Sequence, residues 1–81
     1  MKRTRALENV KNEYVKNFAG KSIWYAVLVD SNDNDYGTGS FNFIEACELL
    51  DRLNGESIAI IDDNDGFCLD IIKRDELEEF M

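Results

Sequence analysis

The chain lacks histidine and proline altogether, and it has only two cysteines, Cys47 and Cys68. The absence of histidine excludes Ser-His-Asp and Cys-His catalytic centres, and also zinc sites that use a histidine ligand. Two cysteines do not make a Cys₄ zinc site within one chain, and these two are too far apart in the sequence for a CxxC redox motif. We therefore expect both to be small core residues, and we expect no catalytic residue, no metal ion and no cofactor.

Long apolar runs are also missing, and residues 1–7 are mostly basic and polar. A membrane-spanning helix needs about 20 consecutive apolar residues, and a signal peptide needs an apolar segment of its own. A secreted domain of this size typically depends on roughly two to four disulfides, which two cysteines do not supply. These features predict a single soluble domain over residues 1–81 that works in the cytoplasm without contacting a membrane.

Negative charge is abundant and unevenly distributed. Residues 1–21 carry six basic and two acidic side chains, which gives +4, whereas residues 22–81 carry three basic and fifteen acidic side chains, which gives −12; together they make −8. An acidic body repels nucleic acid and anionic membranes and attracts basic partners. The charge pattern predicts a protein partner with a basic surface rather than direct binding to nucleic acid. The basic first segment would rest on the acidic body or on a second copy of the chain, so a homodimer is an alternative.

The spacing of apolar residues predicts a helix over about residues 4–18 and then a strand over about residues 22–30. The helix has one apolar stripe, formed by Leu7, Val10, Tyr14 and Phe18. The strand is apolar on both faces, which is typical of a central strand covered on both sides. A run of polar, turn-forming residues at 30–35 then predicts a loop.

Residues 36–41 look extended but contain two glycines, so we expect a short strand that folds back on the first one. A second helix is predicted over about residues 43–54, with Asn42 as its N-cap and Glu45 as the capping-box partner. Gly55 is suited to the left-handed position that ends a helix. These signals define both ends of the second helix.

The remaining residues predict a hairpin and a short helix. Two strands, about residues 57–61 and 67–73, flank the turn 62–66, whose Asp-Gly pair is a common hairpin signal. The side chains of the last strand should alternate between two faces, one formed by Phe67, Leu69 and Ile71 and the other by Cys68, Asp70 and Ile72. The acidic segment 75–81 would add one or two helical turns.

These elements give the order α-β-β-α-β-β-α, and their hairpin connections favour an antiparallel sheet. We therefore expect an α+β fold with a small, mostly antiparallel sheet of three or four strands and helices packed on it. Residues 36–41 decide where the two acidic loops lie. If this segment pairs as a strand, the loops are at opposite ends of the sheet; if it is only a loop, the second helix is a crossover and both loops share one end.

The first acidic loop partly resembles an EF-hand calcium loop that starts at Asp30, because its first, third and fifth residues are suitable oxygen ligands. The sixth position should be glycine and is Asp35, and the twelfth should be a glutamate and is Phe41. The flanking segments are also predicted strands rather than helices. We therefore interpret residues 30–35 as a solvated loop.

The acidic side chains of the two loops, with one tyrosine at a loop base, are the candidate partner-binding residues: Asp30, Asp33, Asp35, Tyr36, Asp62, Asp63 and Asp65. Further acids lie on the outer face of the second helix and in the C-terminal segment. Carboxylates two residues apart on one strand face are roughly 6–7 Å apart, which is comparable to neighbouring phosphates on one nucleic-acid strand. Such a row would imitate nucleic acid.

A resemblance to known proteins is found in the runs 24–30 and 36–41, in the Glu45-Ala46 pair that follows, and in the later run 58–62. In these segments the chain resembles small acidic proteins of bacterial phages and mobile elements. Some of those proteins are anti-CRISPR or anti-restriction inhibitors. The resemblance covers residues 24–72 and implies an inhibitory function, without assigning a role to any residue. The leading hypothesis is a non-catalytic acidic binding protein that mimics nucleic acid and inhibits a DNA- or RNA-binding protein. The alternative is a small self-associating structural or regulatory protein.

Overall fold

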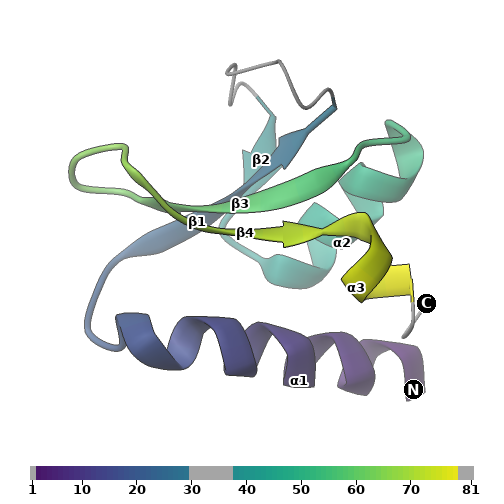
Figure 1. Cartoon of the computed structure of the whole chain (residues 1–81), viewed down its shortest axis with the longest axis horizontal. Helices are drawn as coiled ribbons and strands as arrows, with labels where there is room; N and C mark the ends of the chain where they lie inside the picture. The colour runs from purple at the N-terminus through teal and green to yellow at the C-terminus, as the bar shows by residue number, and fades with distance from the viewer. Residues whose placement is uncertain (1, 30–37, 79–81) are drawn as a thin grey trace.

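The computed structural model describes residues 2–29 and 38–78, and in this part of the chain four strands form one antiparallel sheet in the order β2-β1-β3-β4. The strands are β1 (Ile23–Leu28), β2 (Gly39–Ser40), β3 (Ser57–Asp62) and β4 (Cys68–Lys73). The helices are α1 (Lys2–Val15), which a 3₁₀ turn continues over Lys16–Phe18, α2 (Phe43–Arg52) and α3 (Arg74–Glu78). The predicted α+β fold with an antiparallel sheet is confirmed (Figure 1).

The main core lies between the sheet and the three helices, which share one of its faces (Figure 1). Every strand except β2 contributes buried side chains to it, and so do all three helices: Leu7, Val10, Tyr25, Val27, Phe43, Ala46, Cys47, Leu50, Ile58, Ile60, Ile72 and Leu77. The apolar stripe of the first helix is thus directed at the sheet. Cys47 is a core residue as predicted, but the same prediction for Cys68 is wrong, because Cys68 is exposed on the edge strand β4. Burial of this stripe, more than helix propensity, stabilises a helix in a small domain.

A second, smaller cluster lies on the opposite face of the sheet and consists of Ala26, Leu28, Ala59 and Ile61, with Trp24 packed against it. All four are buried, although the described helices lie on the other side. Because β1 pairs with β2 on one side and with β3 on the other, it is central in the sheet. The prediction of a central strand with two apolar faces is confirmed.

Strand β2 has only two residues, Gly39 and Ser40, which pair with Ala26 and Tyr25 of β1. A Cβ atom at Gly39 would collide with the carbonyl oxygen of Tyr25 and would lie 2.7 Å from a ring carbon of Trp24. Glycine at this position therefore lets the Trp24 ring lie close over the edge of the sheet. The expected strand over 36–41 is present but shorter, and its first two residues lie outside the described part of the chain.

The end of α2 differs from the prediction. The left-handed residue is Asn54, with φ of 54°, and not Gly55. The Gly55 amide donates to the carbonyl of Leu50 at 2.8 Å, and the Asn54 amide donates to that of Asp51 at 3.2 Å, which together form a Schellman motif. Gly55 is required for another reason, because a Cβ there would lie 2.8 Å from the Leu50 side chain.

The expected alternation along β4 is wrong. The register between β3 and β4 shifts between Ile60 and Ile61, whose partners are Asp70 and Cys68. The residue left over, Leu69, forms a β-bulge, and a bulge breaks the two-residue period of a strand. Leu69 and Ile72 therefore both pack against the helix-covered core, although an unbroken strand would place them on opposite faces.

Candidate functional site

The described segments that adjoin the two acidic loops are at opposite ends of β1. Strand β3 runs antiparallel to β1, and its last residue, Asp62, pairs with the first residue of β1, Ile23. The turn after β3 therefore lies beside the start of β1, whereas residues 30–37 follow its other end. Asp30, Asp33, Asp35 and Tyr36 lie outside the described residues. Since β2 pairs with β1, the topology is the extended arrangement and not the compact one.

Of the predicted residues in the second loop, Asp62 is the most buried, and its carboxylate makes contacts within the fold. It is only 5% exposed. One carboxylate oxygen accepts a hydrogen bond from the Asn64 amide at 2.9 Å, and the other lies 3.6 Å from the Lys21 ammonium. These contacts close the turn and tie it to the segment before β1. Asp62 is thus placed as a structural residue of the turn rather than on its surface.

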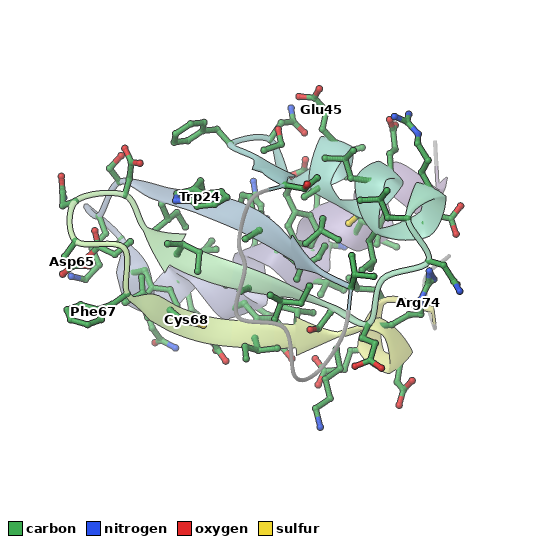
Figure 2. All side chains as sticks on the ribbon, turned by 90° about the horizontal axis from the view of Figure 1, so that it is seen from above. Trp24, Glu45, Asp65, Phe67, Cys68 and Arg74 are labelled. Carbon is green, nitrogen blue, oxygen red and sulfur yellow. The ribbon has the colours of Figure 1, made fainter. Side chains whose placement is uncertain are left out.

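Asp63 and Asp65, in contrast, are exposed. The Asp65 carboxylate accepts a hydrogen bond from the Phe67 amide at 3.1 Å and leaves its second oxygen toward solvent. The Asp63 backbone amide donates to the Ser22 carbonyl at 2.8 Å, which leaves its side chain for external contacts. Figure 2 shows Asp65 and Phe67 together at this end of the molecule. The turn therefore offers two carboxylates to a partner, not three.

The outer face of α2 carries a row of three exposed acids: Glu45, Glu48 and Asp51. They follow one another at intervals of three residues, so they are neighbours on one helix surface, with Cβ atoms about 5–6 Å apart. The opposite face of α2 is buried in the core. Because the apolar face of the helix is buried, the three acids are turned toward solvent. The three-residue spacing of these acids in the sequence indicated that they share one face.

The start of α2 holds Glu45 in place. The Asn42 side chain accepts hydrogen bonds from the amides of Ile44 and Glu45, as predicted for an N-cap. The Asn42 amide donates to the Ser40 hydroxyl at 3.0 Å, and this hydroxyl is 3.2 Å from the Glu45 carboxylate. The expected direct capping-box contact from Glu45 is thus replaced by a contact through Ser40, because Ser40 lies between the two groups.

Most basic side chains near the described acids are already engaged. On α1, Lys11 pairs with Glu8 at 3.0 Å and Lys16 pairs with Glu13 at 3.1 Å. Arg74 lies 3.9 Å from Asp51 and donates to the backbone carbonyls of Gly55 and Leu50 at 2.8 and 3.2 Å. Residues 38–77 contain ten acidic and three basic residues, a net charge of −7. The surface outside α1 therefore has an excess of exposed carboxylates.

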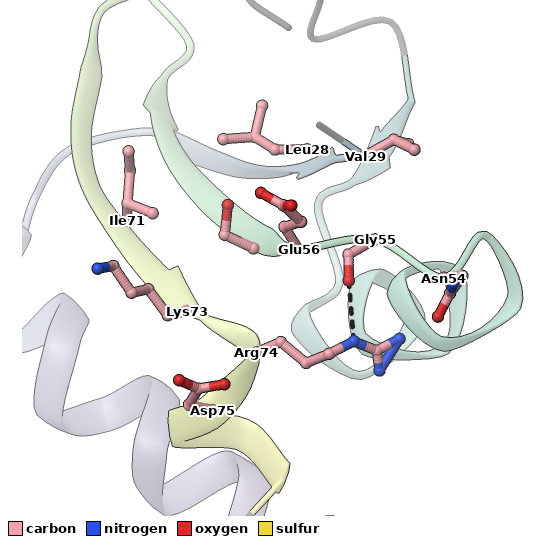
Figure 3. Close-up of a pocket in the computed structure, with 10 residues that line it drawn as sticks. Leu28, Val29, Asn54, Gly55, Glu56, Ile71, Lys73, Arg74 and Asp75 are labelled. Atoms are coloured by element: carbon pink, nitrogen blue, oxygen red, sulfur yellow. Dashed lines mark hydrogen bonds between the residues drawn. The ribbon is translucent and has the colours of Figure 1, made fainter. Parts of the chain in front are cut away.

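A hollow of about 790 Å³ lies at the end of the molecule away from the acidic turn (Figure 3). Its apolar lining includes Leu28, Val29 and Ile71. Its charged lining has two acids and two bases: Glu56, Asp75, Lys73 and Arg74. This hollow was not predicted from the sequence. Val29 and Ile71 are 46% and 43% exposed, but the sequence shows each only as part of an apolar run.

The electrostatic environment of one core residue is also distinctive. Tyr25 packs edge to face against Phe43, with ring centroids 5.1 Å apart. Burial raises the pKa of the Tyr25 hydroxyl above its usual value, and the nearby negative charge of Glu8 raises it further. Within residues 2–29 and 38–78, no three acidic or cysteine side chains are grouped so that they could hold a metal ion.

Comparison of the chain with protein families, with characterised proteins and with solved structures finds no match. None of the helices in the described residues has the length and apolar character needed to cross a membrane.

Proposed function

We propose that the protein is a non-catalytic binding protein, and that its acidic surface engages a basic protein surface which otherwise holds nucleic acid. The observation that carries the proposal is the row of carboxylates on the outer face of α2. Of these three acids, Glu48 has no part in the hydrogen bonds or ion pairs described above. Keeping such charges together destabilises a compact domain, so a role in binding explains them better than a role in folding.

The form of this surface supports mimicry of nucleic acid. Duplex DNA carries about one negative charge per 1.7 Å of its axis, and proteins that bind it do so largely through lysine and arginine. A helix with three carboxylates about 5–6 Å apart presents a sparser but regularly spaced row of negative charge to the same basic side chains. Asp63 and Asp65 extend the negative surface at the far end of the sheet. A cytoplasmic inhibitor of a DNA- or RNA-binding protein would act through such contacts.

The exposed apolar residues are arranged less favourably for the self-association alternative. Phe41 and Phe67 are 68% and 70% exposed. Phe41 follows β2 and Phe67 precedes β4, and these strands are the two edges of the sheet. A dimer interface needs a contiguous apolar patch, and two aromatic rings at opposite edges do not form one. Phe41 and Phe67 therefore give no support to a second copy. Another exposed apolar pair, Val29 and Ile71, lies in a hollow that is also lined by four charged residues.

The test is capture of partners from a bacterial lysate by tagged protein, followed by elution with duplex DNA and identification by mass spectrometry. We expect a DNA- or RNA-binding protein that competing DNA releases. Glu48→Lys should weaken this capture, whereas Glu13→Lys, the same change on the exposed face of α1, should leave it intact. If DNA releases no captured protein, or if both variants behave like the original chain, the proposal is wrong.

A further inference from the structure

The hollow beside Glu56 has the composition of a site for a side chain that is apolar along its length and positively charged at its tip. Its volume of about 790 Å³ lies within the roughly 300–1,000 Å³ that ligand sites usually have. One side is apolar, with Leu28 and Val29 from the end of β1 and Ile71 from β4. Both Val29 and Ile71 leave nearly half of their surface to solvent, which a ligand could cover.

One carboxylate of the hollow, that of Glu56, is placed to meet a cation. Figure 3 shows the Glu56 carboxylate directed toward Leu28, whereas the Lys73 ammonium is directed away from it. Glu56 is held by its backbone alone, since its amide donates to the Leu28 carbonyl and its carbonyl accepts from the Arg74 amide. The Arg74 guanidinium is bound to the carbonyls of Gly55 and Leu50. The carboxylate thus remains the group that can meet a bound cation.

The helix that ends beside the hollow acts in the same direction. α2 terminates at the Schellman motif around Asn54, and both Asn54 and Gly55 line the hollow. The C-terminal end of a helix carries a partial negative charge and is stabilised by cations. The Arg74 guanidinium already neutralises part of this negative charge, because it donates to the carbonyls of Gly55 and Leu50. In the lining as a whole, Lys73 and Arg74 balance the charges of the two acids. Since the Arg74 guanidinium is directed to the two carbonyls, a ligand beside Leu28 would meet the Glu56 carboxylate and the helix end.

We propose that this hollow is the anchor site for a short basic and apolar segment of the partner protein. The aliphatic part of a lysine or arginine would lie on Val29 and Ile71, and its charged tip would meet Glu56, as long basic side chains commonly do at apolar surfaces. The inference rests on the proposed function, because it names the chemistry of the partner at one place on the acidic surface. If the inference is right, apolar contact in the hollow contributes to partner selection in addition to charge.

The test uses three synthetic peptides of equal length, made of alternating lysine and leucine, lysine and glycine, or glutamate and leucine. Binding is followed by two-dimensional NMR of the full chain labelled with ¹⁵N. We expect the lysine–leucine peptide to bind most tightly and to shift the amide signals of Val29, Gly55 and Ile71. The lysine–glycine peptide should bind more weakly, and the glutamate–leucine peptide should not bind.

Matched variants separate the anchor site from general charge attraction. Glu56→Gln should weaken the lysine–leucine peptide by about fivefold, as expected for loss of one partly exposed ion pair. Glu48→Gln should weaken it less, and Glu13→Gln on α1 should leave its affinity unchanged. Ile71→Ser, at a position where the isoleucine is 43% exposed, should remove the advantage of the lysine–leucine peptide over the lysine–glycine peptide.

Two different failures are distinguishable. If both basic peptides bind but shift signals elsewhere, or if Glu48→Gln weakens binding as much as Glu56→Gln, the anchor site is wrong and the acidic binding function stands. If neither basic peptide binds anywhere on the protein, the anchor site and the proposed function are both contradicted. Signals at Val29, Gly55 and Ile71 serve as the reporter in every case.

Discussion

The acidic turn after β3 and the acidic outer face of α2 contain the same kind of side chain in two different roles. In the turn, Asp62 is buried, accepts a hydrogen bond from the Asn64 amide and lies 3.6 Å from Lys21. On α2, Glu48 is exposed and projects into solvent. One carboxylate is part of the fold, whereas the other adds only charge to the surface.

The difference follows from side-chain length and local backbone. Aspartate is short enough to bond to amides two residues further along the chain, and it therefore builds turns. Asp62 and Asp65 both do so. Glutamate in the middle of a helix finds the nearby amides already bonded, and its longer side chain extends outward. A turn aspartate that is buried among its contacts, as Asp62 is, is therefore a poor candidate for binding, whereas an exposed acid on the outer face of a helix is a better one.

The largest effect should come from Asp62→Ala. This change removes an acceptor from the Asn64 amide and leaves Lys21 without its partner, and we expect the free energy of unfolding to fall by about 2 kcal/mol. Urea denaturation followed by circular dichroism measures the loss. A change of less than about 0.5 kcal/mol, the range of ordinary surface substitutions, would mean that the turn does not depend on this carboxylate.

Asn42→Ala comes next, because it removes the cap that begins the acidic helix. Its side chain accepts hydrogen bonds from the amides of Ile44 and Glu45, and loss of such a cap costs about 1 kcal/mol. Asn42→Asp should retain most of this stability, since aspartate caps as well as asparagine. Equal losses in both variants, measured by thermal unfolding, would show that capping is not the role of Asn42.

The core should respond to alkaline pH through Tyr25. Its pKa is raised in the folded state by burial and by the charge of Glu8, so the unfolded chain loses the phenolic proton first as pH rises. Stability should therefore be intact below the usual tyrosine pKa of about 10 and fall as pH rises through the folded value. Tyr25→Phe should remove this part of the alkaline loss. An identical pH profile for the variant would contradict the argument.

The smallest effect on stability should come from Glu48→Gln. This residue contributes surface charge only, so the free energy of unfolding should change by no more than about 0.5 kcal/mol in either direction. The same variant should nevertheless weaken capture of the basic partner. A loss of stability comparable to that of Asp62→Ala would remove the distinction between the two acidic regions.

Periodicity and capping signals in the sequence were sufficient to predict the order of the helices and strands and the face of α2 that packs in the core. The apolar stripe of the first helix and the N-cap at Asn42 are local signals, and the structure contains both. The bulge at Leu69 was not predictable, because it depends on how β4 fits against β3. The end of α2 was misassigned because glycine is usual at the left-handed position, whereas here Asn54 takes it and Gly55 is needed for close packing.

The candidate site was only partly predictable for the same reason. Net charge and the three-residue spacing of acids indicated an acidic surface, but not that Asp62 would be enclosed by Lys21 and Asn64. The hollow depends on the ends of β1, β4 and α2 meeting at one place. No local pattern in the sequence encodes a contact among residues so far apart along the chain.

The most direct test of the central claim is partner capture by a chain in which Glu45, Glu48 and Asp51 are changed together to glutamine, glutamine and asparagine. Urea denaturation of the same sample shows whether the fold is intact, and Arg74 keeps its backbone acceptors in this variant. We predict near-normal stability and loss of the partner that DNA releases. Full capture by a stable triple variant would contradict the claim that the outer face of α2 is a binding surface.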